Sequence, residues 1–146
     1  RRVRQVLWPT LITLFVGGLF ATILGVALAW FFGAETMILK TMAPKSVTSP
    51  IAMLVAEEIG GSASLAAVFV MLTGIVGAMF GFELLRILRI THPAAQGMAL
   101  GIIAHGIGTA RALQEGEETG AFAALAMSMM GVLTAVLMPL AVALIA

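Results

Sequence analysis

Apolar residues along the chain fall into five segments, of which three are long and clean enough to cross a lipid bilayer. A membrane-spanning helix needs about 20 consecutive, predominantly apolar residues. Residues 6–32, 64–82 and 119–146 meet this requirement, and Pro139 is expected to kink the last of them near its end. The pattern therefore predicts an all-α membrane protein with three full transmembrane helices.

The two remaining apolar segments, residues 37–59 and 93–111, are interrupted. The first contains the run PKSVTSP at 44–50, which one continuous helix cannot accommodate. The serine and proline that end this run are typical of a new helix, with serine as its cap. The second contains AHGIGTAR at 104–111, where two glycines around a histidine predict a helix that is weak or broken in its middle.

Cationic side chains near the chain start and after the second span are Arg1, Arg2, Arg4, Arg86 and Arg89. By the positive-inside rule they place both of these ends in the cytoplasm. Residues 33–63 then begin and end outside, which fits a helix–break–helix hairpin with arms of about 12–15 Å. Residues 93–111 either re-enter in the same way or cross outright.

Composition places the chain in a membrane, with the lipid bilayer as its surroundings. Hydrophobic residues make up 61% and charged residues 10%, against about 45–50% and about 25% in soluble domains. A net charge of +1 offers no basic field for nucleic acid. Cysteine is absent, which excludes disulfides and thiolate sites. The chain begins with Arg1, and we expect a single membrane domain that is a piece of a longer protein lacking its N-terminal helices.

The first break combines features of an anion-binding site. Lys45, Ser46, Thr48 and Ser49 lie directly before the helix start at Pro50. A positive helix end, its free backbone N–H groups and a lysine together attract an anion. The alternative is an exposed loop whose hydroxyls only cap a short helix.

The second break carries a similar set of side chains. His105 and Thr109 are four residues apart and share a face if this stretch is helical, and Gly108 lies between them. Histidine can relay a proton, and Arg111 can hold a carboxylate through two hydrogen bonds. Alternatively, His105 bonds a neighbouring carbonyl and Arg111 marks the membrane interface. Proton coupling could involve His105 or Glu57, although Glu57 also fits a solvated turn.

The two breaks lie sixty residues apart, counted from Lys45 to His105, and each has a basic residue, a hydroxyl and an apolar helix start. Paired broken segments are typical of transporters built on repeats. Glycines spaced four apart at 77–81 and 97–101 predict close helix packing. The sequence contains no nucleophile–base pair, metal cluster or phosphate loop, so we expect no enzyme, cofactor or metal.

Residues around the breaks resemble the LrgB/CidB family. The matching stretches are 44–52, 58–61, 67–70, 73–75, 89–90, 97–101, 104–112, 116–117 and 120–122. The resemblance runs from about Pro44 to the end, and Phe82-Glu83 departs from the family pattern. It implies a multi-pass protein of the bacterial inner membrane, longer than this chain, that acts with a small LrgA/CidA-type membrane partner. Members are described as holin/antiholin-like regulators of murein hydrolase activity, while a plastid relative translocates glycolate and glycerate and some bacterial members are linked to pyruvate uptake.

Two functions follow from the residues and the resemblance together. The first is alternating-access transport of a small monocarboxylate of the glycolate, glycerate, lactate or pyruvate class, bound at the two broken helices. The second is a homo- or hetero-oligomeric, holin/antiholin-like pore or regulator of murein hydrolase activity and cell lysis. A pore needs a polar stripe along a span, and in the first span only Thr10, Thr13 and Thr22 offer one.

Overall fold

The computed structural model describes residues 2–145, with side chains placed for residues 8–144. Arg1 and Ala146 lie outside the described residues, as do the side chains of Arg2 and Arg4. No strand occurs in residues 2–145, which confirms the all-α class. The helices are α1 (Arg2–Phe31), α2 (Thr36–Met42), α3 (Ser49–Glu58), α4 (Ala63–Ile87), α5 (Pro93–Glu115) and α6 (Glu117–Ile145).

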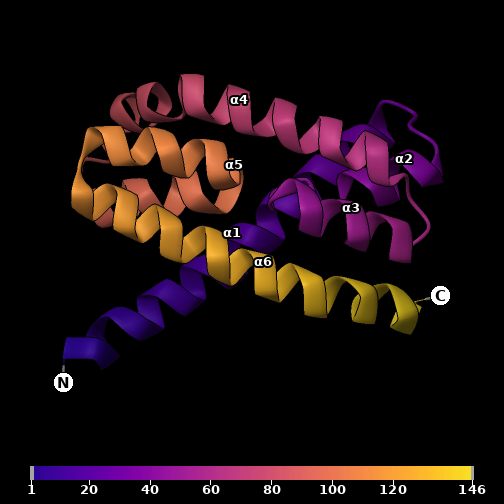
Figure 1. Ribbon diagram of the computed structural model, residues 1–146, viewed down its shortest axis with the longest axis horizontal. Coiled ribbons are helices and arrows are strands. Elements are labelled where there is room, and N and C mark those ends of the chain that lie inside the picture. The colour runs from indigo at the N-terminus through magenta and orange to yellow at the C-terminus, as the bar shows by residue number, and fades with distance from the viewer. Residues whose placement is uncertain (1, 146) are drawn as a thin grey trace.

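Three of these helices are long and apolar enough to cross a membrane: Trp8–Phe31, Ala63–Ile87 and Glu117–Leu144. They correspond to the three predicted spans. Helix α4 ends at Ile87, five residues beyond the predicted end of the span at residue 82. Glu83 and Arg86 lie in this extension, and their ion pair of 2.8 Å across one helical turn stabilises it. In Figure 1, α4 lies along one side of the molecule, and α1 and α6 cross on the other.

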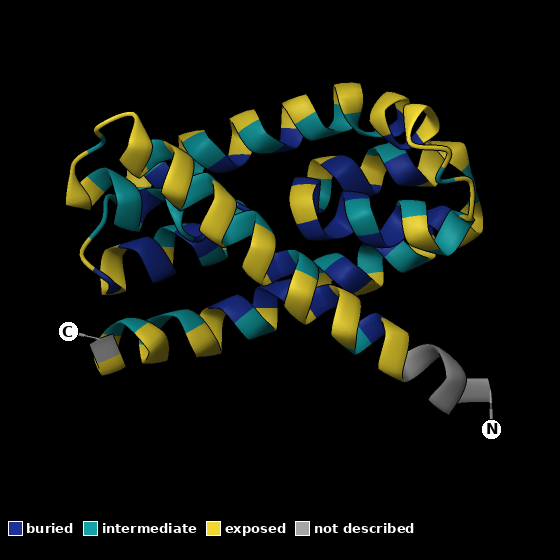
Figure 2. Cartoon of the chain, turned by 180° about the vertical axis from the view of Figure 1, so that it is seen from behind, coloured by how far each residue is buried: buried dark blue, intermediate teal, exposed yellow. Residues whose placement is uncertain are grey.

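The outer faces of these helices are apolar. Figure 2 shows exposed residues along the outside of α1, α4 and α6, and they include Phe15, Leu19, Met79 and Leu140. In water such faces would be unfavourable, whereas a bilayer covers apolar side chains and leaves helical backbone groups satisfied. The burial pattern therefore fits a membrane protein.

We name the two ends of the molecule by a charged residue at each. Helix α1 begins and α4 ends at the Arg86 end, where Arg89 also lies. Helix α1 ends and α4 begins at the Glu57 end, where α2 and α3 also lie. The first two spans therefore run in opposite directions between the two ends, as the cationic residues predicted.

The first interrupted segment is two separate helices, α2 and α3, joined by the non-helical residues 43–48. This confirms the predicted break. The predicted cap was wrong by one residue, because Thr48 is the N-cap of α3 and Ser49 its first helical residue. Thr41 in α2 ties the segment to the start of α4, since its Oγ1 accepts a 2.9 Å hydrogen bond from the Ser62 N–H.

The second interrupted segment, α5, is a helical hairpin. His105 has φ 41° and ψ −128°, so the chain turns back there. A Cβ placed on Gly108 would lie 2.8 Å from the carbonyl oxygen of Leu100. In a straight helix these two residues would be about 12 Å apart along the axis. Residues 93–104 and 106–115 therefore form two antiparallel arms that enter from the Arg86 end and return to it, which excludes an outright crossing.

Glycines allow the arms of α5 to pack closely on the spans. A Cβ on Gly77 of α4 would lie 2.6 Å from the Cβ of Ala104, and one on Gly101 would collide with the Ala123 carbonyl of α6. Both predicted glycine motifs are thus confirmed as helix contacts.

The two hairpins enter from opposite ends and meet at the middle of α6. Ile51, near the start of α3, packs on Gly131, where a Cβ would lie 2.9 Å from Ile51 Cδ1. Thr109, just past the turn of α5, points its hydroxyl at the Met127 sulfur, 3.8 Å away. Met127 and Gly131 are one helical turn apart. The tips of both broken segments therefore share one level of the molecule.

A single apolar cluster fills the space around these tips. Its members come from every helix except α2 and from the first break: Leu14, Val47, Ala52, Ala56, Ala66, Val70, Met98, Ile102, Ala126 and Met130. Burial of this cluster holds the break residues in place, since unpaired loop backbone at membrane depth requires cover from protein.

Candidate functional site

Lys45 carries a positive charge to the middle of the molecule. Its Nζ donates a 3.1 Å hydrogen bond to the carbonyl oxygen of Ala21 in α1. Ala21 lies ten residues before Phe31, about 15 Å from the end of α1. A hydrocarbon core is about 30 Å thick, so this ammonium lies near its middle. Glycine at position 25 makes room for the lysine, because a Cβ there would be 2.8 Å from Nζ.

The charge of Lys45 has no counter-charge within the structure. An ammonium has three donors, and Ala21 takes one. No carboxylate among residues 8–144 lies within ion-pair distance of Nζ. Ionisable groups inside a membrane are costly and are normally paired. The Lys45 ammonium is therefore available to an anion.

The hydroxyl groups of the first break are next to this ammonium in the chain. Ser46 is 3% exposed, and its Oγ is buried without a hydrogen-bond partner in the described part of the chain. The Thr48 side chain makes no cap hydrogen bond at the start of α3. The first N–H groups of α3 consequently lack a side-chain acceptor. Ser46, the start of α3 and the remaining donors of Lys45 thus have no side-chain acceptor among residues 8–144.

A cavity of about 1020 Å³ lies between α1 and the first arm of α5, and Lys45 is in its wall. Most of the wall is apolar, including Phe20 and Ile102. The polar and charged side chains that line it are Thr10, Thr13, Lys45, Thr73, His92 and Glu118. This composition, a mostly apolar space with few polar groups, is typical of small-molecule sites.

His105, at the second break, is committed to contacts within the protein. Its Nε2 donates to the carbonyl oxygen of Val70 at 2.9 Å, and the ring is 3% exposed. The ring rests on Gly74, where a Cβ would lie 2.6 Å from Cε1. The Thr109 hydroxyl donates to the His105 carbonyl at 2.8 Å. His105 thus bonds a neighbouring carbonyl, which was the alternative expected for it.

A non-glycine residue with positive φ is uncommon, and such strain persists only where the surroundings enforce it. At His105 the hydrogen bond to Val70 and the contact with Gly74 provide that enforcement. Gly108 follows three residues later and lets the second arm pack against Leu100. Together they fix the turn of α5.

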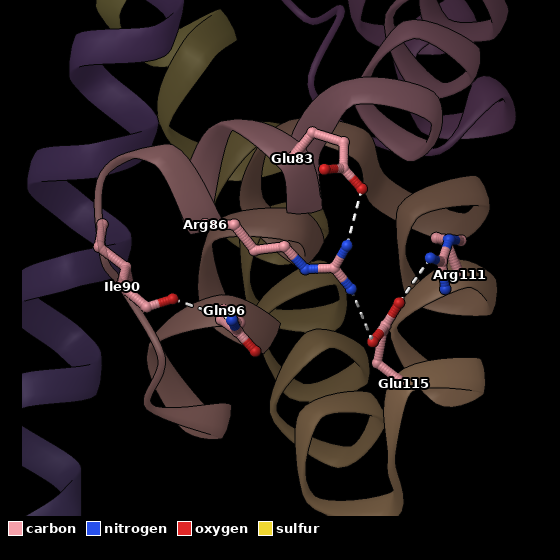
Figure 3. Close-up of polar contacts among 6 residues, drawn as sticks. All are labelled: Glu83, Arg86, Ile90, Gln96, Arg111 and Glu115. Atoms are coloured by element: carbon pink, nitrogen blue, oxygen red, sulfur yellow. Dashed lines mark hydrogen bonds and ion pairs between the residues drawn. The ribbon is translucent and has the colours of Figure 1, made fainter.

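Arg111 lies in a cluster of charges at the Arg86 end (Figure 3). Its guanidinium carbon is 5.1 Å from the centre of the Phe82 ring, and its NH2 pairs with Glu115. Arg86 in turn lies 2.8 Å from Glu83 and 3.7 Å from Glu115. This network joins the second arm of α5 to the end of α4. The structure therefore does not bring Arg111 to Lys45. Its position among charges at the Arg86 end fits the alternative, in which Arg111 marks the membrane interface.

The remaining predicted residues fall on either side of the first break. Ser49 and Pro50 form the first turn of α3, and Pro50 is exposed. Glu57 is exposed near the end of α3, well away from the turn of α5. Thr73 is a cavity residue that sequence reasoning missed. Its signal was a single hydroxyl in the middle of an otherwise apolar span.

Comparisons with known proteins identify the family. The sequence profile of the LrgB-like family matches residues 1–144, so the chain belongs to that family. The match includes α1 and so extends beyond the expected start at Pro44. Antiholin-like protein LrgB of Bacillus cereus (strain B4264) and of Bacillus anthracis (strain A0248) are each 30% identical over 139 residues. The aligned region covers 95% of this chain and 60% of each relative. No solved structure matches.

Proposed function

We propose that this multi-pass member of the LrgB-like family carries a small monocarboxylate across the membrane, bound between Lys45 and the start of α3. The observation that supports this most is the Lys45 ammonium, which lies at mid-depth beside a cavity with no carboxylate partner among residues 8–144. A monocarboxylate supplies the missing single negative charge. Its two oxygens also accept the unused hydrogen bonds, which are strongest when the acceptor is charged.

In this proposal each group at the first break has a separate task. Lys45 neutralises the carboxylate, and Ser46 supplies a hydroxyl donor that is otherwise unpartnered. Thr48 and Ser49 add hydroxyls beside the positive end of α3. Pro50 has no N–H, so it leaves one donor fewer to satisfy at this helix start. One ammonium and a few hydroxyls suit a small monocarboxylate, and the resemblance to the LrgB/CidB family implies the class of glycolate, glycerate, lactate and pyruvate.

In this proposal the second break, at the turn of α5, forms the part of the substrate pathway that moves during transport. The α5 hairpin approaches from the Arg86 end, while the α2–α3 hairpin approaches from the Glu57 end. Transporters with broken helices close one side of a central site while they open the other. His105, Gly108 and Thr109 set the turn of α5, and Arg111 holds its second arm at the membrane interface. In this proposal the protein acts as a carrier and not as an enzyme.

Uptake of labelled lactate, glycolate and pyruvate into proteoliposomes tests the proposal. Lys45→Met removes the charge and keeps the length of the side chain, so saturable uptake is expected to fall at least about 100-fold. Leaving the carboxylate without its partner accounts for that size of loss. Lys40→Met, in α2 and outside the break, is the matched control and should transport normally. Unchanged affinity in Lys45→Met would overturn the carboxylate site.

The second candidate is an antiholin-like regulator of pores and murein hydrolases. It is favoured by the name of the relatives, Antiholin-like protein LrgB. In that role the protein would act in the bacterial cytoplasmic membrane, in an oligomer with itself or with a small LrgA/CidA-type partner. Release of a trapped dye from the same vesicles, without saturable uptake, would favour this role over the carrier.

A further inference from the structure

Thr73 and the Lys45 ammonium each lie near the middle of the span that positions them. Thr73 follows the first residue of α4, Ala63, by ten positions, about 15 Å from the Glu57 end. Ala21, which holds Lys45 Nζ, is also ten positions from that end in α1. Both Thr73 and Lys45 line the same cavity. The two side chains therefore face a common space, each near the middle of a span.

The hydroxyl of Thr73 is not used to satisfy its own helix. Hydroxyls of Thr41, Thr109 and Ser128 each donate to the carbonyl four residues earlier, at 2.7, 2.8 and 2.9 Å. Within residues 8–144, the Thr73 hydroxyl makes no hydrogen bond of this kind. It is partly exposed, towards the cavity. A hydroxyl in an apolar wall can serve a ligand as donor and as acceptor.

The position of Thr73 is fixed by its neighbours in the chain. Val70 accepts the His105 ring hydrogen bond, and Gly74 accommodates the ring itself. These contacts hold this turn of α4 in one register against α5. A hydroxyl held in this way selects for ligand geometry more sharply than one on a mobile loop.

We propose that Thr73 is a specificity-determining residue that hydrogen-bonds the oxygen on C2 of the carboxylate held by Lys45. It accepts from a 2-hydroxyl group and donates to a 2-oxo group, so it favours 2-hydroxy and 2-oxo monocarboxylates over propionate, which has no C2 oxygen. This inference rests on the proposed carboxylate site. A site built to hydrogen-bond a ligand group discriminates against analogues that lack it.

Competition against labelled lactate in proteoliposomes measures this preference directly. In the wild-type protein, unlabelled lactate and pyruvate should compete about tenfold better than propionate. Thr73→Val keeps the shape and removes the hydroxyl, so this ratio should fall to about one, with propionate competing as before. Thr73→Ser, which retains the hydroxyl, is the matched control and should keep most of the preference.

The outcomes separate this inference from the proposal on which it rests. An unchanged lactate-to-propionate ratio in Thr73→Val overturns the role of Thr73, even if uptake still depends on Lys45. Absence of saturable carboxylate uptake in the wild-type protein overturns both. If Thr73→Val does not accumulate in the membrane, Thr73→Cys, whose thiol is a weak hydrogen-bonding group, is expected to lower the ratio in the same direction.

Discussion

The two hairpins of this protein look alike in sequence but differ in how their polar groups are satisfied. At the α2–α3 break, Lys45 has one protein hydrogen bond, and the Ser46 hydroxyl has none among the described residues. At the turn of α5, the His105 ring, the His105 carbonyl and the Thr109 hydroxyl all have protein partners. A basic residue beside a break therefore does not by itself identify a ligand site. What distinguishes the first break is its unused donors.

The same difference separates a binding element from a structural one. The polar groups of the α5 turn are satisfied by hydrogen bonds within the protein, and these bonds hold the turn as a rigid unit. The α2–α3 break is held by packing of Val47 in the central cluster, while the Ser46 hydroxyl has no partner among the described residues and Lys45 donates a single hydrogen bond. Mutations at the α5 turn should consequently change stability, and mutations at the first break should change ligand binding.

The largest expected stability effect comes from filling the space under the His105 ring. Gly74→Ala would place a Cβ 2.6 Å from the ring and 2.8 Å from Ile107 Cδ1. Overpacking of this kind costs about 1–3 kcal/mol. Thermal unfolding in detergent should show a lower Tm. Gly17→Ala is the control, because its Cβ would meet Ile102 at an ordinary 3.6 Å. Equal Tm values for the two variants would show that His105 does not fix the turn.

A smaller effect compares one hydroxyl from each hairpin. Thr109→Val removes the hydrogen bond to the His105 carbonyl and should lower the free energy of unfolding by about 1 kcal/mol. Ser46→Ala removes a buried hydroxyl without a protein partner in the described chain, so stability should be unchanged or slightly higher. Lactate affinity should instead fall several-fold in Ser46→Ala only. The reverse pattern, measured by unfolding and uptake, would contradict the contrast between the hairpins.

The smallest effect is expected at the charge cluster that ties the second arm of α5 to α4. Glu115→Gln removes one charge that pairs with both Arg86 and Arg111. These side chains are partly exposed, and exposed ion pairs contribute about 0–1 kcal/mol. The Tm should therefore change little, and less at high salt than at low salt. A loss as large as that of Gly74→Ala would mean that the cluster, and not the turn, holds the hairpin.

The spans and both breaks could be predicted from sequence because they depend on local signals. Apolar runs of sufficient length indicate the spans, and prolines within residues 44–50 rule out a continuous helix. The fold-back of α5 could not be predicted, since it depends on the backbone of His105 and the contact of Gly108 with Leu100. The sequence left that segment able either to cross or to re-enter.

The candidate site was predictable only in its first half. Lys45 and the hydroxyls after it are adjacent in the chain, so their proximity needs no tertiary information. The ion pair of Arg111 with Glu115 is local, because the two residues are four apart in one helical arm. The contact of Arg111 with Phe82 and the pairing of Glu115 with Arg86 depend on the fold-back of α5. Thr73 could not be identified from sequence, because a hydroxyl within an apolar helix indicates a ligand site only once the structure shows that it lines a cavity with Lys45.

Equilibrium binding of labelled lactate to the purified protein tests the central claim most directly, because it separates binding from transport. The wild-type protein and Lys40→Met should bind saturably and with equal affinity, and Lys45→Met should show no saturable binding at the same concentrations. Glu115→Gln, which alters the charged end of the other hairpin, should bind with near wild-type affinity. Equal binding by Lys45→Met and the wild-type protein would contradict the assignment of the first break as the anion site.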